Sequence, residues 1–296
     1  MTVPAQARGF VALLRLPYWL MTGGLSLLTA FAITKNPLSL SIQTVLLVFF
    51  SMALITSAGF AINDFFDRES DAVIKPKRPI PSGALSLKQV VAVSGVLFTA
   101  GLVMAFFINW LSFVIIAADS ALLLIYSMLV KRKSGFIANV LVGVLTGTAF
   151  LYGEATVSNP PTVSIISLSL YPIALGTIGG NVLRDILSLD GDTKIGYPTL
   201  PQKIGISKSA KVAAAFFLLT GLFAPLPFFV GSFSVYYLLP ILVWSVLLIY
   251  SSVRLVTVSS TVSNVRKYER IVTMSMILLP LALILQALSH AVGGIL

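Results

Sequence analysis

The sequence predicts an all-α integral membrane protein with nine transmembrane helices, which we expect to form a single domain over residues 1–296. Of these residues, 57% are hydrophobic and only 10% are charged, whereas a soluble globular domain carries about 25% charged residues. Apolar segments recur along the whole chain, and the loops between them alternate between basic and almost uncharged. A soluble core could not bury this much apolar surface, so the composition indicates a polytopic membrane protein.

Nine segments are long and apolar enough to cross a bilayer, which requires about 20 mostly apolar residues. Because their number is odd, the two ends of the chain are expected on opposite sides of the membrane. The segments are Gly9–Thr34, Ser41–Ile62, Leu87–Ile108, Trp110–Val130, Phe136–Glu154, Val163–Leu183, Ala210–Val230, Val235–Val256 and Ile271–Val292.

The basic residues of the loops predict the orientation of these spans. Lys and Arg collect after the second, fourth, sixth and eighth spans, whereas the other loops hold only Lys35. Cytoplasmic loops are enriched in Lys and Arg, so we expect the N-terminus and these four loops in the cytoplasm and the C-terminus outside the cell membrane. The basic residues are Arg68, Lys75, Lys77, Arg78, Lys131, Arg132, Lys133, Lys194, Lys203, Lys208, Arg254, Arg266, Lys267 and Arg270.

Two of the cytoplasmic loops are long, at about residues 64–86 and 185–209. Each begins with an acidic cluster and continues with the Pro- and Gly-rich sequences KPKRPIPSG and GYPTLPQKIG. Pro at this density stops helices and stiffens turns, and loops of this length in a compact protein are usually functional. We therefore expect both loops to be functional.

The first acidic cluster has the sequence NDFFDRESD and follows the second span. Asn63, Asp67 and Asp71 are spaced i, i+4 and i+8, so they share one face if the helix continues, and Asp64 lies on the same flank. Carboxylates at this spacing repel one another unless a cation lies between them. Carboxylate and amide oxygens are the ligands that Mg²⁺ prefers, so these four residues are candidate metal ligands. The alternative is a solvated helix end.

A second acidic cluster follows the sixth span, in the sequence NVLRDILSLDGD. Asp185 and Asp192 are seven residues apart and share a helical face, whereas Asp190 points elsewhere unless the helix has ended. Asp185 and Asp192 are further candidate metal ligands. Two acidic clusters at equivalent helix ends, each followed by a basic loop, suggest one site built from two halves of the chain.

Basic residues beside these acids suggest that the site holds a polyphosphate through metal, because Mg²⁺ inverts the repulsion between carboxylates and phosphate. Contacts to phosphate oxygens could come from basic side chains and one amide. The alternative for most of these cations is signalling of topology and contact with lipid headgroups. The candidate phosphate-binding residues are Arg15, Arg68, Lys77, Lys131, Arg184 and Asn181, and Arg78 and Arg132 could supply further contacts.

Two residues of the fourth span are notable. Asp119 lies in its middle, where a carboxylate is costly unless it is paired, protonated or facing a wet cavity. Tyr126 lies seven residues later on the same face, where its ring could face a reacting cation or anchor the helix at the interface. The chain has no Cys and only one His, His290, which excludes thiolate metal sites and disfavours polyhistidine sites and Ser-His-Asp catalysis.

The motifs resemble those of the UbiA family of intramembrane prenyltransferases. NDFFDRESD is similar to the NDxxDxxxD motif of that family, RDILSLDGDTKIG to its second aspartate-rich motif, and YSMLVK at Tyr126–Lys131 to its Tyr and Lys region. Ser188 stands where many relatives have an Asp, so Asp190 is a possible substitute. KPKRPIPSG and GDTKIGYPTLPQKIG are most similar to archaeal enzymes that geranylgeranylate geranylgeranylglyceryl phosphate.

The resemblance implies a helical barrel open to lipid, capped by the two long loops. It further implies that two Mg²⁺ ions hold a polyprenyl diphosphate, that Asp67, Asp71, Asp185 and Tyr126 serve catalysis, and that the acceptor is a lipid-like phosphate. An aromatic acceptor of quinone biosynthesis is the alternative. An ion-coupled transporter is disfavoured, because seven acids lie at helix ends and only Asp119 is central. The pattern of CDP-alcohol phosphotransferases is not found, and neither a nucleic acid nor an obligate protein partner is expected.

Overall fold

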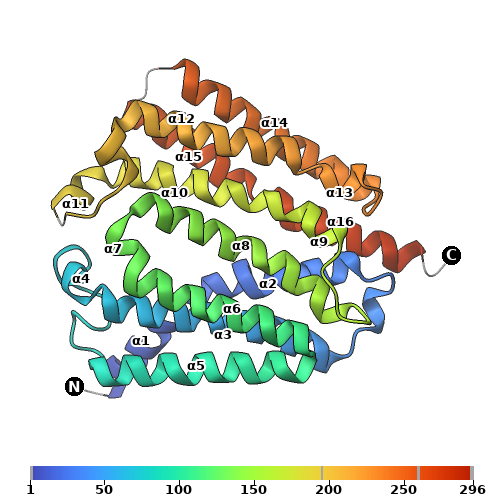
Figure 1. The fold of residues 1–296 in the computed structure, drawn as a ribbon, viewed down its shortest axis with the longest axis horizontal. Coiled ribbons are helices and arrows are strands. Elements are labelled where there is room, and N and C mark those ends of the chain that lie inside the picture. The colour runs from blue at the N-terminus through green and yellow to red at the C-terminus, as the bar shows by residue number, and fades with distance from the viewer. Residues whose placement is uncertain (1–2, 195, 259–260, 294–296) are drawn as a thin grey trace.

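A computed structural model describes residues 3–194, 196–258 and 261–293. Within these residues the protein is all helical, and nine helical segments are long and apolar enough to cross a membrane. The predicted fold class is confirmed. The segments lie roughly side by side, with α1 and α4 at one end of the bundle and the C-terminal part of α16 at the other (Figure 1).

Among the described residues, four of the nine spans are single helices and five consist of two or three consecutive helices. Three short helices, η1 (Pro37–Ser39), α4 (Arg68–Ile74) and α11 (Leu189–Lys194), lie between spans. The spans are formed in order by α1 (Val3–Leu14) with α2 (Pro17–Ile33); α3 (Ile42–Phe66); α5 (Leu87–Ile108); α6 (Trp110–Ile125) with η2 (Tyr126–Val130) and α7 (Lys131–Lys133); α8 (Gly135–Val157); α9 (Ile165–Leu170) with η3 (Tyr171–Ala174) and α10 (Leu175–Leu187); α12 (Leu200–Phe223) with α13 (Leu226–Phe229); α14 (Val235–Thr257); and α15 (Val262–Ser275) with α16 (Leu278–Gly293).

Several helix boundaries differ from those expected. Helix α12 begins at Leu200, about ten residues before the predicted span, and is interrupted at Gly205, where φ is 80°. Helix α15 begins at Val262, although the expected ninth span began at Ile271. The two long loops contain helices α4 and α11. These helical turns carry Lys, Arg and Asp, so their low hydropathy hid helices that continue beyond the apolar core.

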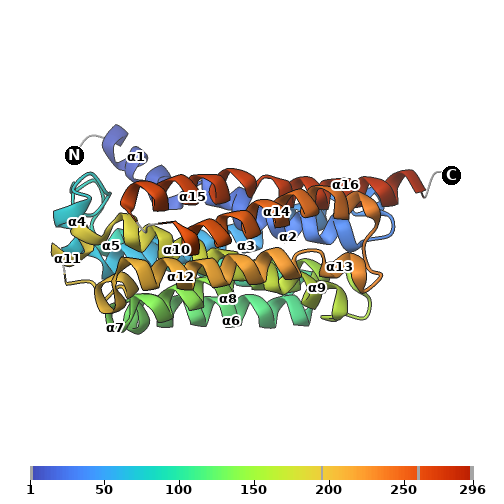
Figure 2. The same cartoon turned by 90° about the horizontal axis from the view of Figure 1, so that it is seen from above.

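Helix α2 joins the two halves of the bundle, because it packs on α3, α8 and α16. Figure 2 shows the bundle from above, with α6 and α8 on one side and α15 and α16 on the other. A Cβ on Gly23 would lie 2.4 Å from the Phe49 carbonyl oxygen, and a Cβ on Gly153 would lie 2.6 Å from the Ser26 carbonyl oxygen. Small residues therefore allow the backbones of α3 and α8 to approach α2 closely.

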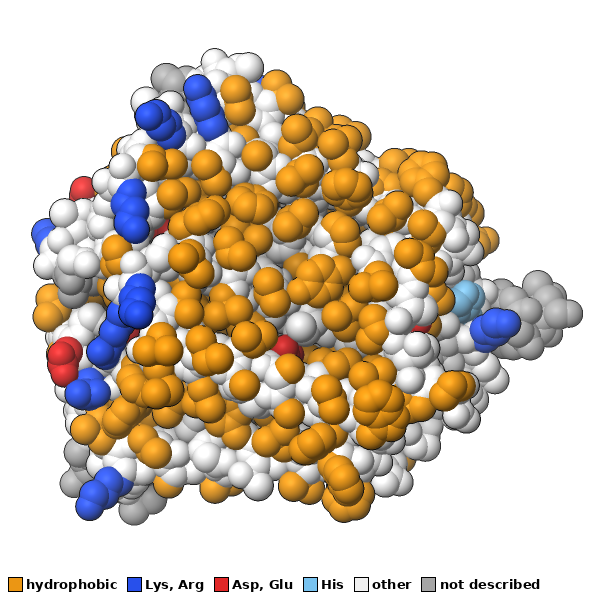
Figure 3. Space-filling model, viewed as in Figure 1, with side chains coloured by type: hydrophobic (Ala, Val, Ile, Leu, Met, Phe, Trp, Pro, Cys, Tyr) orange, Lys and Arg blue, Asp and Glu red, His pale blue; other side chains and the backbone are white. Residues whose placement is uncertain are grey.

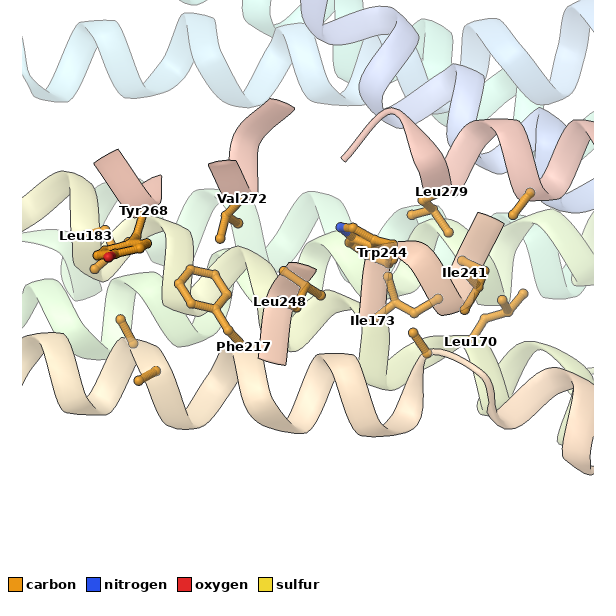
Figure 4. Close-up of a cluster of buried hydrophobic side chains, with 14 of the residues drawn as sticks. Leu170, Ile173, Leu183, Phe217, Ile241, Trp244, Leu248, Tyr268, Val272 and Leu279 are labelled. Atoms are coloured by element: carbon orange, nitrogen blue, oxygen red, sulfur yellow. The ribbon is translucent and has the colours of Figure 1, made fainter. Parts of the chain in front are cut away.

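The larger hydrophobic core lies in the C-terminal half, between α10, α12, α14, α15 and α16. Phe217 of α12 and Leu248 and Trp244 of α14 lie in this core, as Figure 4 shows. A second core, around Ile55, Ile116 and Tyr152, packs the helices of the N-terminal half. These two cores hold α3 and α10 in place, whose C-terminal ends carry the two acidic clusters.

Asp119 is buried in the middle of α6, where Thr148 of α8 contacts it. The Thr148 Oγ1 atom lies 2.7 Å from Asp119 Oδ2 and 2.7 Å from the Leu145 carbonyl oxygen. One hydroxyl hydrogen can be donated to only one of these acceptors. The other carboxyl oxygen, Oδ1, has no hydrogen-bond partner among the described residues. The contact therefore links α6 to α8.

We expect the Asp119→Asn variant to keep its activity and thermal stability. The amide can donate to Thr148 Oγ1 while Thr148 donates to Leu145, and an interhelical hydrogen bond in a membrane is worth only about 0.6 kcal/mol, so turnover should stay within about threefold. Thermal unfolding in detergent and steady-state turnover measure the two quantities. A loss of turnover with an unchanged melting temperature would contradict the structural role and assign Asp119 to the reaction.

Candidate active site

The charged side chains gather at one end of the bundle. Figure 3 shows Lys and Arg concentrated at the edge where α4, α7 and α11 lie, while hydrophobic side chains cover most of the remaining face. This distribution is typical of a protein whose apolar belt faces lipid and whose polar end faces water. Both acidic clusters lie at this polar end.

The first acidic cluster forms a bent but continuous helical face. Helix α3 ends at Phe66, Asp67 has φ −86° and ψ 1°, and α4 begins at Arg68. The helical hydrogen bonds persist across this bend, from Asp67 N to the Asn63 carbonyl at 2.9 Å and from Asp71 N to the Asp67 carbonyl at 2.8 Å. The expected i, i+4, i+8 alignment is therefore present.

The carboxylates of this cluster are buried and paired with basic side chains. The exposed fractions of Asp64, Asp67 and Asp71 are 4%, 8% and 4%. Arg15 Nη2 donates to Asp64 Oδ1 at 2.5 Å, and Arg78 Nη1 contacts both Asp64 Oδ1, at 3.0 Å, and Asp71 Oδ2. An ion pair with Asp67 is made by Lys131. Pairing of this kind is what allows carboxylates to be buried.

Arg15 reaches the cluster through an unusual backbone. Its φ is 50°, in the left-handed region that is costly for residues other than Gly. This conformation connects α1 to α2 and places the guanidinium 4.4 Å from the centre of the Phe60 ring as well as against Asp64. Strain of order 1 kcal/mol is held here by an ion pair and a cation–π contact.

The second acidic cluster bends in the same way as the first. Helix α10 ends at Leu187, Ser188 has φ −101° and ψ 5°, and α11 begins at Leu189. Hydrogen bonds again cross the bend, from Ser188 N to Arg184 at 2.9 Å and from Asp192 N to Ser188 at 3.0 Å. Ser188 thus occupies the place in the second motif that Asp67 occupies in the first.

The acids of the second cluster accept hydrogen bonds from neutral groups. Asn139 Nδ2 of α8 donates to Asp185 Oδ2 at 2.8 Å, and Ser188 Oγ donates to Asp192 Oδ2 at 2.6 Å. Asp192 also lies within electrostatic range of Asp185. In contrast to the first cluster, neither carboxylate forms an ion pair with a described residue.

Two tyrosines lie between the clusters. Tyr126 begins η2, a wide π-helical turn of a kind often found at functional sites, and it lies within electrostatic range of both Asp67 and Asp185. The Tyr197 hydroxyl lies 3.4 Å from Asp67 Oδ1, and Lys131 Nζ lies 5.5 Å from the centre of the Tyr197 ring. Burial and the Asp67 carboxylate raise the pKa of Tyr197, so its hydroxyl stays protonated and can donate. The two halves of the chain therefore meet at these rings.

Several expected phosphate-binding residues lie away from this centre. Arg68 pairs with the exposed Glu69 at 3.1 Å, and Lys77 is exposed. Arg184 is 58% exposed, and it contacts Asn181 Oδ1 at 3.3 Å and Glu269 Oε1 at 3.8 Å. The structure thus brings Arg15 and Lys131 to the acids and leaves Arg68, Lys77 and Arg184 at the surface.

The oxygen donors of the first cluster suit a hard cation such as Mg²⁺, because they are carboxylates and one amide. In the structure, however, the positions of these oxygen donors are set by their pairing with basic side chains. Within the described residues no three or more Asp, Glu, His or Cys side chains converge on a common point. Asn63 Nδ2 donates to Asp67 Oδ2 at 2.8 Å, and Asn63 Oδ1 lies 3.5 Å from Lys131 Nζ. The donor chemistry fits a divalent metal once the paired cations move aside.

Two residues that were not predicted from the sequence contribute to the site: Asn139 and Tyr197. Arg78 was expected among the basic residues that could contact phosphate, but nothing in the sequence distinguished its position from that of Lys77. Asn139 is a polar residue in the first turns of an otherwise apolar span, which is a usable signal. Tyr197 lies 130 positions from Asp67, so no local pattern connects the two.

The chain matches the UbiA prenyltransferase family over residues 18–282. It belongs to this family and is an intramembrane prenyltransferase. Among its relatives, digeranylgeranylglyceryl phosphate synthase from Natronomonas pharaonis is 37% identical over 235 residues, which cover 79% of this chain and 82% of the relative. The enzyme of the same name from Methanocaldococcus jannaschii is 32% identical over 261 residues, covering 88% and 90% of the two chains.

Solved structures agree with the fold. A structure of digeranylgeranylglyceryl phosphate synthase superposes with a TM-score of 0.82 at 27% identity, covering 96% of this chain and 99% of the other. A UbiA homologue from Archaeoglobus fulgidus, bound to GPP and Mg²⁺, superposes with a TM-score of 0.65 at 19% identity over 96% and 99% of the chains. The second likeness concerns the fold alone.

Proposed function

We propose that this enzyme transfers a geranylgeranyl group from its diphosphate to the free hydroxyl of geranylgeranylglyceryl phosphate, forming a second ether. The observation that carries the reaction class is the buried cluster in which Asp64, Asp67 and Asp71 face Arg15, Arg78 and Lys131. Such a cluster offers both carboxylates for metal and cations for phosphate. The choice of acceptor is supported by the relatives of 32–37% identity that carry this activity in their name.

The metal-binding residues in this proposal come from both clusters. Two Mg²⁺ ions, when bound, supply positive charge that makes the diphosphate a better leaving group. The proposed ligands are Asn63, Asp64, Asp67, Asp71, Asp185 and Asp192. Arg15, Arg78 and Lys131 lie among these residues, within reach of the same oxygens that would face the diphosphate.

Side chains around the reacting carbon exclude water and stabilise charge. The bond from the first prenyl carbon to the diphosphate oxygen breaks, and the acceptor oxygen bonds to that carbon. Tyr126 lies between the acidic clusters, where its ring can face the allylic cation. The acceptor loses its hydroxyl proton as the ether forms, and the departing diphosphate or a nearby carboxylate takes it. A membrane-embedded barrel keeps bulk water from the cation.

The orientation of the protein belongs to the same proposal. We place the N-terminus, α4, α7 and α11 in the cytoplasm and the C-terminus outside, because Lys and Arg collect at the end formed by these helices. The diphosphate would then be bound from the cytoplasmic side, while its prenyl tail extends along the apolar interior of the barrel.

A competition assay tests the acceptor. Purified protein receives geranylgeranyl diphosphate, Mg²⁺ and equal amounts of geranylgeranylglyceryl phosphate, 4-hydroxybenzoate and 1,4-dihydroxy-2-naphthoate, and the products are identified by mass spectrometry. We expect digeranylgeranylglyceryl phosphate as the main product, because the basic residues at this end suit an acceptor that carries a phosphate. Prenylation of an aromatic ring in preference to the glycerol lipid would instead assign the enzyme to quinone biosynthesis.

A further inference from the structure

Arg78 holds the two outer carboxylates of the first cluster together. A single atom, Nη1, contacts Asp64 Oδ1 at 3.0 Å and also Asp71 Oδ2. In metal sites, a divalent cation binds oxygens of two carboxylates in the same way. Arg15 pairs with the same Asp64 oxygen, and Lys131 contacts Asp67 while approaching Asn63.

Each carboxylate of this cluster has a cationic partner without any ligand, and Lys75 adds a further positive charge within electrostatic range of Asp71. Three buried carboxylates face three basic side chains, whose own exposed fractions are only 19–22%. Removing the partner of a buried charge is strongly unfavourable. A metal ion that bound these carboxylates by itself would leave three cations without partners, and a diphosphate that bound by itself would meet carboxylates.

We propose that Arg15, Arg78 and Lys131 act as internal substitutes for the metal and exchange partners when metal and diphosphate arrive together. The carboxylates pass from the basic side chains to the metal, and the released guanidinium and ammonium groups pass to phosphate oxygens. This inference rests on the proposed function and adds to it a rule of binding: the free enzyme holds a divalent metal weakly, and the diphosphate makes that binding strong. By linkage, the metal strengthens diphosphate binding by the same factor.

The loop that carries Arg78 is built for such an exchange. Backbone hydrogen bonds join Arg78 N to the Lys75 carbonyl, Ser82 N to the Arg78 carbonyl and Leu85 N to the Pro79 carbonyl, each at 2.9 Å. Pro79 is buried and follows Arg78 directly, which limits the backbone further. The backbone is therefore fixed, so rotation of the Arg78 side chain is enough to move its charge from one partner to another.

Metal binding to variants of the free enzyme tests this exchange. The probe is Mn²⁺, whose unbound fraction is read by electron paramagnetic resonance, with and without the unreactive analogue geranylgeranyl S-thiolodiphosphate. For the wild type we expect weak binding of Mn²⁺ alone and binding at least about tenfold tighter with the analogue, as is usual for coupled ligands. For Arg78→Gln we expect Mn²⁺ alone to bind about tenfold tighter than to the wild type, because Asp71 has lost its internal cation.

Matched variants separate this effect from a general change of charge. Lys133→Gln removes one positive charge from the nearby surface, where Lys133 is exposed, and Arg78→Lys keeps a charge at position 78. Both should bind Mn²⁺ alone as weakly as the wild type. Lys131→Gln frees Asp67 and should behave like Arg78→Gln, so the test survives if one variant fails to fold. Mg²⁺ should also raise the melting temperature of Arg78→Gln more than that of the wild type.

The outcomes distinguish this inference from the proposed function. Equal affinity of wild type, Arg78→Gln and Lys131→Gln for Mn²⁺ alone would overturn the exchange, as would wild-type binding that the analogue does not strengthen. Turnover of the wild type with geranylgeranyl diphosphate, measured in parallel, would remain in that case. An absence of turnover with every acceptor would instead contradict the proposed function.

Discussion

Replacing Asp67 or Asp71 by Asn is expected to reduce prenyl transfer by about a thousandfold, because each change removes a buried carboxylate from the proposed metal site and such electrostatic stabilisation is worth several kcal/mol. Both carboxylates are almost fully buried and each faces a basic side chain. Asn keeps the shape of the side chain, so the packing of α3 and α4 should survive. Single-turnover rates at saturating Mg²⁺ and donor measure the effect.

Glu69 provides the matched control for this prediction. It lies between Asp67 and Asp71 in the sequence, yet its side chain is 82% exposed and pairs only with Arg68 among the described residues. Glu69→Gln should therefore keep wild-type turnover within about twofold, since exposed ion pairs are worth 0–1 kcal/mol. Addition of EDTA to the wild type should abolish turnover. Full activity in the chelator, or in both Asp variants, would remove metal from the proposed mechanism.

Asp185→Asn is expected to lower turnover by two orders of magnitude or more, and Asn139→Ala by about 10- to 100-fold. Asp185 is an acid of the second cluster that lies within electrostatic range of Tyr126, and Asn139 donates a 2.8 Å hydrogen bond to it. Groups that orient a metal ligand commonly contribute about 10- to 100-fold. Steady-state kinetics with varied Mg²⁺ should show the Asn139→Ala loss mainly as a higher metal requirement.

Asp190→Asn controls for the loss of one acidic residue from the same segment. Its side chain is exposed and its carboxylate has no ion pair with a described residue. We expect wild-type turnover and an unchanged metal requirement. If Asp190→Asn were as inactive as Asp185→Asn, Asp190 would take the role of the Asp that many relatives have at the position of Ser188. The assignment of metal ligands within the second cluster would then change.

The membrane fold was predictable because hydropathy is a strong signal over a span. Errors arose where a helix continues into water: the first turns of α12 and α15 carry Lys and Arg, so composition alone ended these helices too early. The alignment of Asn63, Asp67 and Asp71 was predictable because helical spacing survives the bend at Asp67. For the membrane spans and for this alignment, patterns over a short stretch of sequence were sufficient.

The partners of the acids were harder to predict, because they depend on how distant segments meet. Arg78 and Lys77 are neighbours in one loop, yet only Arg78 reaches the cluster. Which of the two side chains reaches the acids depends on the path of the loop, and no periodicity in the sequence encodes that path. Asn139 and Tyr197 come from other spans and loops, so their contacts with Asp185 and Asp67 required the packed structure. The variants described above test the roles of Arg78 and Asn139.

The burial of the paired acids has a consequence for the response of the enzyme to ionic strength. Salt screens exposed charges over about 8 Å at physiological concentration but affects buried pairs much less. The exposed pair of Arg68 and Glu69 will therefore weaken as monovalent salt is added, whereas the pairs at Asp64 and Asp71 will persist. Monovalent salt should accordingly change the surface of this end of the protein while leaving the arrangement of its acids intact.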